Sequence, residues 1–261
     1  MSRLVVAFAI FAAVAAGAAP GQTIRVAGAA DLQPVLPPIL EQFKQATGID
    51  AQVTYQASAA LTTQIQNGAP FDVFLSANLE YPQKLISSAL AEGLGDGTAG
   101  TSIVYAKGAL VLWTRKDAHL PDPNIDLLRS PQVRHLAIAN PDRAPYGKAA
   151  VAFLQKLGLY ELVKPKLVVA ENISQAAQFV DSGNADAGLI SLTSALTPRL
   201  SADGRYFLIP ADQYPPIEQG AVLVSKTQQR VAAKKFLVFL MSAPIQEQLR
   251  KYGLTPGRPV P

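Results

Sequence analysis

Apolar and polar positions along the chain follow two spacings, one typical of strands and one typical of helices. Residues 53–78 show both. They open with an alternating apolar segment, continue through Ser58 and two alanines, and then carry Leu61 and Ile65 at helical spacing before an Asn-Gly pair. A period of two indicates a strand, and a spacing of three or four indicates a helix. This stretch therefore predicts a strand, a turn of small residues and a helix, with a further strand at 72–77.

The same patterns predict the remaining elements of the amino-terminal half. Strands are expected at 23–30, 49–55 and 101–114, and helices at 32–43 and 82–90. Pro37 and Pro38 fall inside the first of these helices, so we expect them to kink that helix or to delay its start. A glycine-rich turn over 93–100 separates the second helix from the long strand.

A polar, proline-rich loop over 115–131, with a short helix near Leu127, interrupts the alternation, which then restarts. The second half is expected to contain strands at 135–139, 167–170, 187–190 and 221–225, and helices at 148–157, 175–182, 228–241 and 244–252. Strands that alternate with helices at this spacing pair in parallel through right-handed crossovers. We therefore expect two βαβαβ units, each with its own core.

Chain length and element order predict two lobes. At ~100–200 residues per domain, the chain could form one large domain or two small ones, and the order of its elements decides between them. The last section is too short to be a domain, so we expect it to cross back and complete the first unit. The predicted lobes are 23–104 with 225–261, and 105–224 including the hinge strands. The predicted fold class is therefore α/β, of the two-lobed periplasmic-binding-protein kind (type II-like). Each lobe is a mostly parallel sheet flanked by helices, and two hinge strands let the lobes close around a ligand.

Residues 1–19 have the features of a secretory signal peptide. Arg3 precedes an apolar run over 4–16, and small residues follow, with a cleavage point after Ala18 or Ala19. The apolar run is shorter than the ~20 residues of a membrane-spanning helix. The chain contains no Cys, so its stability must come from a packed core and not from disulfides. We expect an exported, periplasmic protein.

Charge and motif content argue against several classes of function. The net charge is +4 and Lys and Arg form no cluster, so we expect no nucleic-acid partner. His119 and His135 lack the partner spacing of a metal site, and there is neither a Gly-x-Ser-x-Gly segment nor a Walker loop. We therefore expect no enzyme, no metal centre and no cofactor. An exported hydrolase with a Ser or Asp nucleophile remains the alternative from a different class.

The turns that follow the strands are the candidate ligand sites. Sheets of this type bind ligands beyond the carboxyl ends of their strands, where the turns at Asp31 and Ser58 both fall. The first N–H groups of a helix have no partner inside that helix and can donate to an anion. Ser58 adds a hydroxyl donor at that point. These turns indicate an anion-binding edge.

Several segments resemble, in order, the periplasmic molybdate-binding proteins of ABC importers. The most specific is Ser-x-x-Leu-x-x-Gln-Ile-x-x-Gly-Ala-Pro-x-Asp-Val-Phe at 58–74. The others are 24–43, 139–171 with Pro-x-x-x-Pro-x-Gly at 141–147, and 239–255 with Lys-Tyr-Gly-Leu-Thr. The resemblance implies a monomeric receptor that captures molybdate, and also tungstate, between its lobes and delivers it to a membrane permease driven by an ATPase. Another anion, such as sulfate or a small organic acid, is the nearest alternative.

The resemblance also implies an oxyanion held by hydroxyls and backbone N–H groups, without any positive side chain. By motif, the hydroxyl position of the first turn falls on Asp31 and that of the second turn on Ser58. The backbone donors fall on Tyr146, in the Pro-x-Gly segment, and on Ile173, after Glu-Asn. The side-chain donor after the Gly-Leu-Ile strand falls on Ser191.

Two of these positions depart from the family pattern. Ser191 stands where many relatives have Tyr, and the Tyr146 phenol is a candidate to replace the missing one. Asp31 stands where the family has a hydroxyl, and an ionised carboxylate ~4 Å from one negative charge costs about 4 kcal/mol at an effective dielectric near 20, roughly doubled for a dianion. We consider three arrangements, in this order: the carboxylate caps the next helix while its backbone N–H donates, the carboxyl is protonated, or the ligand is not a tetrahedral dianion.

Overall fold

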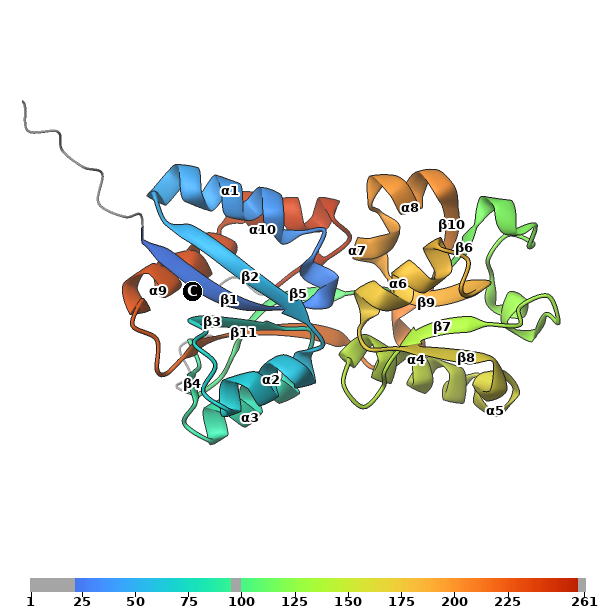
Figure 1. Cartoon of the computed structure of the whole chain (residues 1–261), viewed down its shortest axis with the longest axis horizontal. Coiled ribbons are helices and arrows are strands. Elements are labelled where there is room, and N and C mark those ends of the chain that lie inside the picture. Colours follow the sequence, from blue (N-terminus) through green and yellow to red (C-terminus); the bar gives the residue numbers. More distant parts are fainter. Residues whose placement is uncertain (1–21, 95–99, 258–261) are drawn as a thin grey trace, which may run out of the picture.

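The chain folds into two α/β lobes that lie side by side along the long axis of the molecule (Figure 1). The structure, a computed structural model, describes residues 22–94 and 100–257. The predicted signal peptide, 1–19, lies outside the described residues. The blue amino-terminal and red carboxy-terminal segments share one lobe in Figure 1. Within the described residues, no helix is long and apolar enough to cross a membrane.

The first lobe contains a seven-stranded sheet in the order β12-β5-β11-β3-β1-β2, with β4 paired to β11. β1 pairs in parallel with β2 and β3, whereas β11 runs antiparallel to β3 and β5. Its strands are β1 (Thr23–Ala29), β2 (Asp50–Gln56), β3 (Val73–Ser76), β4 (Ala91–Glu92), β5 (Ile103–Gly108), β11 (Ile217–Val224) and β12 (Thr255–Pro256). Its helices are η1 (Ala30–Leu32), α1 (Leu36–Thr47), α2 (Ser58–Gln66), α3 (Glu80–Ser87), α9 (Arg230–Leu240) and α10 (Ala243–Lys251).

The second lobe contains a five-stranded sheet in the order β10-β6-β9-β7-β8. β7 is parallel to β8 and β9, and β6 is antiparallel to β9 and β10. Its strands are β6 (Leu110–Arg115), β7 (Leu136–Ala139), β8 (Leu167–Ala170), β9 (Ala187–Ser191) and β10 (Gly204–Leu208). Its helices are α4 (Pro145–Lys156), α5 (Tyr160–Val163), α6 (Ile173–Asp181), α7 (Leu192–Ala195), α8 (Pro198–Asp203), η2 (Lys116–Ala118), η3 (Ile125–Arg129), η4 (Lys164–Lys166) and η5 (Ala211–Gln213).

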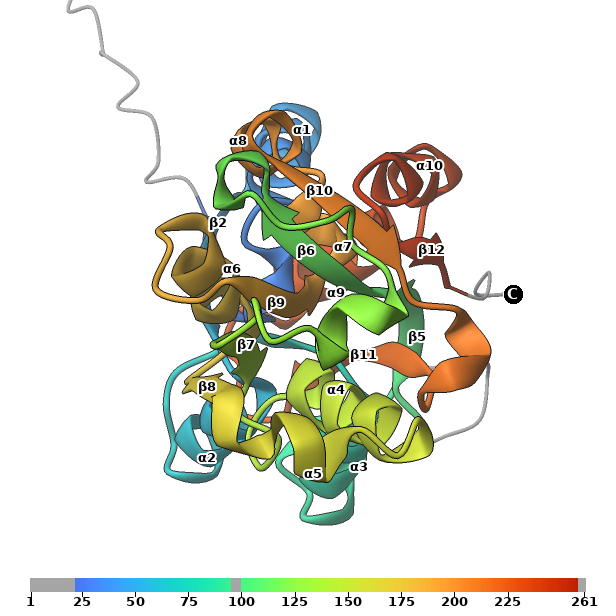
Figure 2. The same cartoon turned by 90° about the vertical axis from the view of Figure 1, so that its right-hand side faces the viewer.

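Helices cover both faces of each sheet, which explains the continuously apolar central strands. All residues of β3, β7 and β9 are buried, as expected where both faces of a sheet are covered. Phe43 of α1 packs its ring 5.3 Å from the rings of both Phe236 and Phe239 of α9, so α1 and α9 share one face of the first sheet. In the second lobe, α4 and α6 lie on opposite sides of the sheet (Figure 2). The α/β fold class predicted from the sequence is confirmed, but the expectation of mostly parallel sheets is wrong. Among the described strands, β11 and β12 pair antiparallel in the first sheet, and β6 and β10 in the second.

The long strand expected at 101–114 is two strands in different sheets. β5 ends at Gly108 and β6 begins at Leu110, where the chain passes from the first lobe to the second. A Cβ atom on Gly108 would lie 2.1 Å from the Tyr146 hydroxyl oxygen. The break therefore allows the backbone to pass directly beneath a side chain of α4, a contact that apolar periodicity does not encode.

Two predicted helix starts are displaced, and proline explains both. α1 begins at Leu36 and not at Leu32, with Pro37 and Pro38 in its first turn, and the short helix η1 precedes it. α4 begins at Pro145 and not at Lys148, so that Tyr146 belongs to the helix. Proline is well tolerated in the first helical turn because its missing N–H needs no partner there.

Strand pairing divides the chain differently from the predicted lobe boundaries. Those boundaries, 23–104 with 225–261 and 105–224, assigned most of β5 and all of β11 to the second lobe. Hydrogen bonds pair both strands within the seven-stranded sheet instead. The boundaries between moving lobes remain a prediction. No element was predicted for 192–215, where α7, α8 and β10 complete the second lobe.

Candidate functional site

Each candidate residue lies at the point where a parallel strand ends and a helix follows it. Asp31 is in η1 after β1, Ser58 begins α2 after β2, Tyr146 is in the first turn of α4 after β7, Ile173 begins α6 after β8, and Ser191 caps α7 at the end of β9. All five residues are buried. The carboxyl ends of parallel strands meet at one edge of a sheet. The two lobes therefore bring these turns together where they face each other.

Asp31 is the centre of the contacts between the lobes. Its Oδ2 atom accepts hydrogen bonds from Gln219 Nε2 at 2.5 Å and from the Tyr146 hydroxyl at 3.1 Å. Its backbone carbonyl accepts a hydrogen bond from the Thr193 hydroxyl at 2.8 Å. Gln219 belongs to the first lobe, whereas Tyr146 and Thr193 belong to the second. One fully buried residue of the first lobe thus receives two donors from the second.

The two oxygens of the Asp31 carboxyl differ sharply. Oδ2 has two donors, whereas Oδ1 is the one buried side-chain oxygen or nitrogen of the described residues without a hydrogen-bond partner. The arrangement considered first, a carboxylate that caps the following helix, is absent. Asp31 lies within η1, and the next helix, α1, has Val35 at its N-cap and no side-chain cap hydrogen bond. Arg143, in the turn before α4, pairs with Glu171 at 3.0 Å and not with Asp31.

Burial dominates the electrostatics of Asp31. Loss of water raises the pKa of its carboxyl from 3.8 to about 6, although hydrogen bonds from Gln219 and Tyr146 and the nearby N–H of its own peptide act to lower that pKa. The pKa values of Tyr146 and Tyr105 are raised well above their ordinary range, mainly by burial and then by the Asp31 charge. Desolvation favours the neutral form of every group here.

Three residues of this network were not predicted from the sequence. Gln219 Oε1 accepts a hydrogen bond from the Tyr105 hydroxyl at 2.7 Å, so that Tyr105, Gln219, Asp31 and Tyr146 form one hydrogen-bonded chain. Thr193 joins it through the Asp31 carbonyl. The available signal was Gln219 itself, a polar residue in the first half of β11, just before the small and apolar run that ends the strand.

Ser58 has a hydroxyl proton free for a ligand. Its Oγ atom accepts a hydrogen bond from the Ala77 N–H at 3.1 Å, and Ala57, not Ser58, is the N-cap of α2. Oγ is therefore oriented by an incoming donor. The neighbouring N–H, that of Ala59, donates across the lobe junction to the Arg143 carbonyl at 3.2 Å.

The second lobe presents a serine cap and a helix start. Ser191 Oγ accepts from the Ser194 N–H at 3.2 Å and lies 2.9 Å from the hydroxyl oxygens of both Thr193 and Ser194. Its hydroxyl is thus engaged within its own turn. The Tyr146 phenol, considered as a replacement for the absent family tyrosine, donates to Asp31. Ile173 opens α6, whose N-cap Asn172 bonds to a neighbouring N–H.

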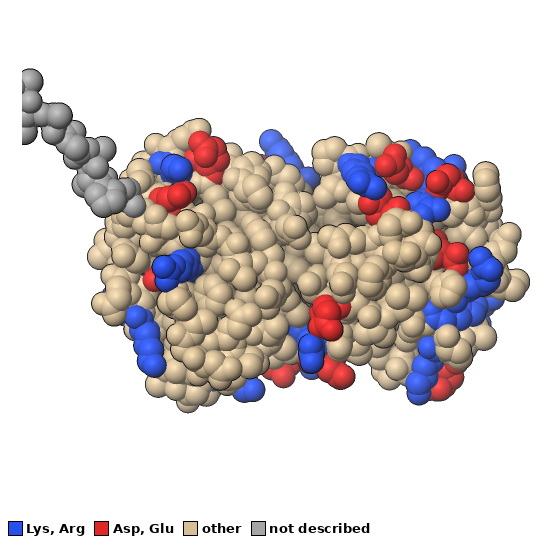
Figure 3. Space-filling model, viewed as in Figure 1, with Lys and Arg blue, Asp and Glu red and all other residues tan. Residues whose placement is uncertain are grey.

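Exposed contacts close the rim around these buried groups. Ser174 donates to Gln33 at 2.8 Å, and Lys148 lies 3.2 Å from Glu80; both contacts cross between the lobes. Charged side chains of both signs are scattered over the face shown in Figure 3, with no large field of one sign. An exposed ion pair contributes at most ~1 kcal/mol, so these contacts position the lobes more than they hold them together.

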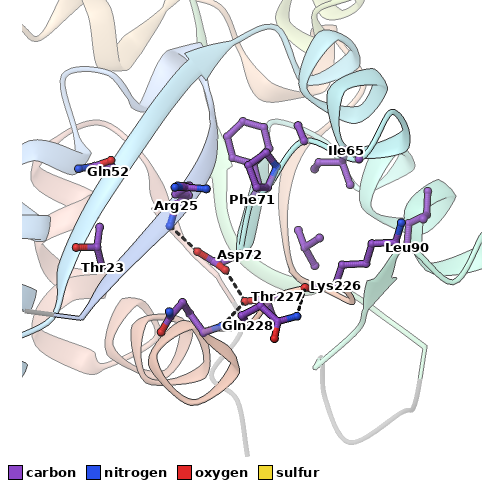
Figure 4. A pocket seen from close by; sticks show the side chains of 15 residues that line it. Thr23, Arg25, Gln52, Ile65, Phe71, Asp72, Leu90, Lys226, Thr227 and Gln228 are labelled. Atoms are coloured by element: carbon purple, nitrogen blue, oxygen red, sulfur yellow. Dashed lines mark hydrogen bonds between the residues drawn. The ribbon is translucent and has the colours of Figure 1, made fainter.

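A hollow of about 560 Å³ lies elsewhere, at the amino-terminal edge of β1 and β3 (Figure 4). Its buried carboxylate, Asp72, accepts from the Arg25 N–H at 2.7 Å and from the Thr227 hydroxyl, so both oxygens are satisfied. Asp72 therefore ties two loops together, and this hollow lacks the unpartnered group found at the lobe junction. No group of three His, Asp or Glu within 22–94 and 100–257 could hold a metal ion.

Comparisons with known proteins agree on one family. Residues 24–255 match the family described as "Bacterial extracellular solute-binding protein". "Molybdate-binding protein ModA" of Azotobacter vinelandii is 39% identical over 253 residues, covering 97% of each chain. The protein of the same name from Rhodobacter capsulatus is 37% identical, covering 95% of this chain and 93% of its own. The solved structure of the Azotobacter vinelandii periplasmic molybdate-binding protein matches with a TM-score of 0.82 and 30% identity, covering 90% of this chain and all of that one.

Proposed function

Because this chain belongs to the bacterial extracellular solute-binding proteins and, among them, to the molybdate-binding proteins, we propose that the junction of its lobes is the site of molybdate capture. The protein is a binding component of an ABC importer and not an enzyme. Molybdate is its transported ligand and not a cofactor. Tungstate, which has the same shape and charge, is proposed as a second ligand.

The ligand contacts are proposed to be Asp31, Ser58, Tyr146, Ile173 and Ser191. The observation that supports this assignment most directly is that all five are buried at strand-to-helix turns that face each other across the lobe junction. None of the ion pairs found among the described residues includes Asp31, so no Lys or Arg side chain neutralises the site. Oriented hydroxyl and N–H donors replace the water that a dianion loses on entry, because hydrogen bonds to charged acceptors are short and strong.

Selection would then rest on the size of the site and the placement of its donors. Larger and smaller tetrahedral dianions carry the same charge. A site that binds them through hydrogen-bond donors, without a cation, distinguishes them by whether those donors reach the anion oxygens. Ser58 is the best-oriented side-chain donor, since the Ala77 N–H holds its Oγ in place. Ser191 is engaged by Ser194 and Thr193, and would reach the ligand only by exchanging one of these contacts.

The partners follow from the transport role. The protein serves a membrane permease and its ATPase, and it acts in the periplasm, as its molybdate-binding relatives do. We further propose that it acts as a monomer and that residues 1–19, which lie outside the described residues, direct its export.

A thermal-shift series with molybdate, tungstate, sulfate and phosphate tests this function. Ligand at 100 times its Kd stabilises the folded protein by about 2.7 kcal/mol, which raises Tm measurably. We expect molybdate and tungstate to raise Tm and sulfate to leave it unchanged. If only sulfate or an organic acid stabilises the protein, the site binds that anion and not molybdate. If none of the anions raises Tm, the proposal is refuted.

Replacing Ser58 by Ala tests the assigned donor. Loss of one hydrogen bond to a charged ligand costs about 1.5–3 kcal/mol, so molybdate Kd should rise roughly 10-fold to 100-fold in isothermal titration calorimetry. Thr63→Ala, on the exposed side of the same helix, is the matched control and should bind as the parent does. Equal affinities of the two variants would remove Ser58 from the site.

A further inference from the structure

The unpartnered Oδ1 atom of Asp31 is the feature that the family resemblance leaves unexplained. It is fully buried, at a junction where every other buried polar side-chain atom of the described residues has a partner. A buried polar atom left without a hydrogen bond is costly, and an ionised one more so. Oδ1 is thus the atom of the site that most needs a partner from outside the chain.

The groups that face Asp31 do not supply a counter-charge. They are Tyr146 from α4, Gln219 from β11 with Tyr105 from β5 behind it, and Thr193 from α7. Two other elements, α6 and β2, pack against η1. The charged residue of α6 is Asp181 at its carboxyl end, which pairs with Arg199. The titratable residues of β2 are Tyr55 and, at the amino end of the strand, Asp50. The surroundings contain tyrosines, amides and hydroxyls, and no cation.

Donor and acceptor geometry identifies the oxygen that could carry a proton. Oδ2 already accepts two hydrogen bonds, from Gln219 and Tyr146, and therefore serves as the carbonyl-like oxygen of a carboxylic acid. Oδ1 accepts none. A proton on Oδ1 converts this empty acceptor into a donor without disturbing either bond to Oδ2.

We propose that Asp31 binds the oxyanion as a neutral carboxylic acid, with its Oδ1–H donating to an anion oxygen, so that capture of the dianion takes up one proton. This inference rests on the proposed function. It adds the protonation state in which Asp31, an acid where the family has a hydroxyl, is compatible with the binding of a dianion. The proton comes from solvent, is held between Oδ1 and the anion, and returns to solvent on release. No other bond forms or breaks.

The electrostatics of the closed lobes favour the same state. Burial alone already raises the pKa of Asp31 to about 6, and an adjacent dianion acts in the same direction. In open lobes the carboxyl regains water and its ordinary, lower pKa. Between the two pKa values, Asp31 is ionised before binding and neutral after it, so affinity is highest at low pH and falls as pH rises toward the pKa of the complex.

Anions that carry their own proton provide the contrasting case. Molybdate and tungstate at neutral pH are acceptors only, and they need a donor at Oδ1. Hydrogenphosphate brings an O–H, which an ionised Asp31 would accept without any uptake of a proton. The two protonation states of Asp31 therefore predict opposite preferences between fully ionised and protonated oxyanions.

Isothermal titration calorimetry of the purified protein with molybdate tests the proposal. Titrations at pH 7.5 in two buffers with different heats of ionisation measure the protons taken up, and a Kd series runs from pH 6.5 to 8.5. We expect uptake near one proton and a Kd that rises about 10-fold per pH unit. Asp31→Asn places an N–H donor at the Oδ1 position, so its uptake should be near zero and its Kd constant across this range.

Asp72→Asn is the matched control, because Asp72 is a buried carboxylate of the same lobe whose two oxygens are both satisfied. It should keep the parent's proton uptake, and circular dichroism verifies that each variant is folded.

Molybdate binding by the parent without proton uptake and with a constant Kd would overturn the inference and leave the proposed function standing. Tight phosphate binding without uptake would overturn it in favour of an ionised Asp31. Failure of both the parent and Asp31→Asn to bind molybdate or tungstate would overturn the proposed function and this inference with it.

Discussion

At the residue scale, four side chains connect the two lobes through one buried hydrogen-bonded chain. Tyr105 donates to Gln219, while Gln219 and Tyr146 donate to Asp31. Gln219 accepts from Tyr105 and donates to Asp31, because its amide carries an acceptor oxygen and a donor nitrogen. Its removal would take one hydrogen bond from each neighbour in a buried site, leaving Tyr105 only the longer contact to the Ser76 carbonyl at 3.4 Å and Asp31 only Tyr146.

We therefore predict that Gln219→Ala destabilises the protein more than a surface glutamine does. Each buried polar group left unsatisfied costs about 1–3 kcal/mol, and two are affected, Tyr105 and Asp31. Urea unfolding followed by circular dichroism measures the change. The control is Gln52→Ala, an exposed position in strand β2, which should change the free energy of unfolding by less than ~0.5 kcal/mol. Equal changes in the two variants would contradict the structural role assigned to Gln219.

At the element scale, the junction between β5 and β6 controls how the lobes meet. The backbone leaves the first sheet at Gly108 and enters the second at Leu110. Gly108 is needed for space and not for an unusual backbone angle, because a Cβ there would lie 2.1 Å from the Tyr146 hydroxyl and 3.1 Å from Gln219 Nε2. The same glycine thus permits the strand break and the approach of Tyr146 to Asp31.

Gly108→Ala should displace Tyr146 and weaken ligand binding more than it weakens the fold. Overpacking a buried site costs about 1–3 kcal/mol, and Tyr146 can relieve the contact only by moving away from Asp31. We expect molybdate Kd to rise roughly 5-fold to 100-fold by calorimetry. Gly188→Ala in β9, where a Cβ would meet its nearest neighbour at 3.1 Å, is the milder control. Unchanged affinity in Gly108→Ala would show that Tyr146 is not confined as described.

At the scale of the whole molecule, closing the lobes buries an ionisable group. Asp31 belongs to the first lobe, and Tyr146 and Thr193 of the second lobe cover it. Its pKa rises from 3.8 to about 6 in the closed arrangement. Because the folded, closed form holds the proton more tightly than a hydrated carboxyl does, closure is most favourable below about pH 4 and loses this advantage as pH rises through 6.

Without ligand, the protein should therefore open as pH rises. The change in the pKa of Asp31 corresponds to about 3 kcal/mol of free energy, enough to shift the ratio of closed to open forms roughly 100-fold between pH 4 and 8. Small-angle X-ray scattering should give a larger radius of gyration at pH 8 than at pH 5. Asp31→Asn should give the same radius at both. Equal expansion of the parent and Asp31→Asn would assign the opening to other groups.

Local patterns in the sequence were sufficient for most of the elements and for the strand-to-helix turns that carry the proposed donors. The strand and helix around Ser58 could be predicted because apolar periodicity depends on neighbouring residues alone. The same applies to the turns at Asp31 and Ile173, which follow strands that apolar alternation identifies. The resemblance to molybdate-binding proteins, carried by contiguous motifs, is confirmed by the relatives that this chain matches.

Contacts between distant parts of the chain were decided only by the tertiary structure. Gln219 meets Asp31 across 188 positions, and Tyr146 meets it across 115, so neither contact leaves a trace in local periodicity. The assignment of β5 and β11 to the first sheet likewise depends on which strand edges were free to pair. The sequence alone determined that an acid stands at the anion-binding turn. Only the fold determined that one of its oxygens is satisfied and the other is not, because burial and hydrogen bonding arise from the packing of two lobes and not from the order of residues in either.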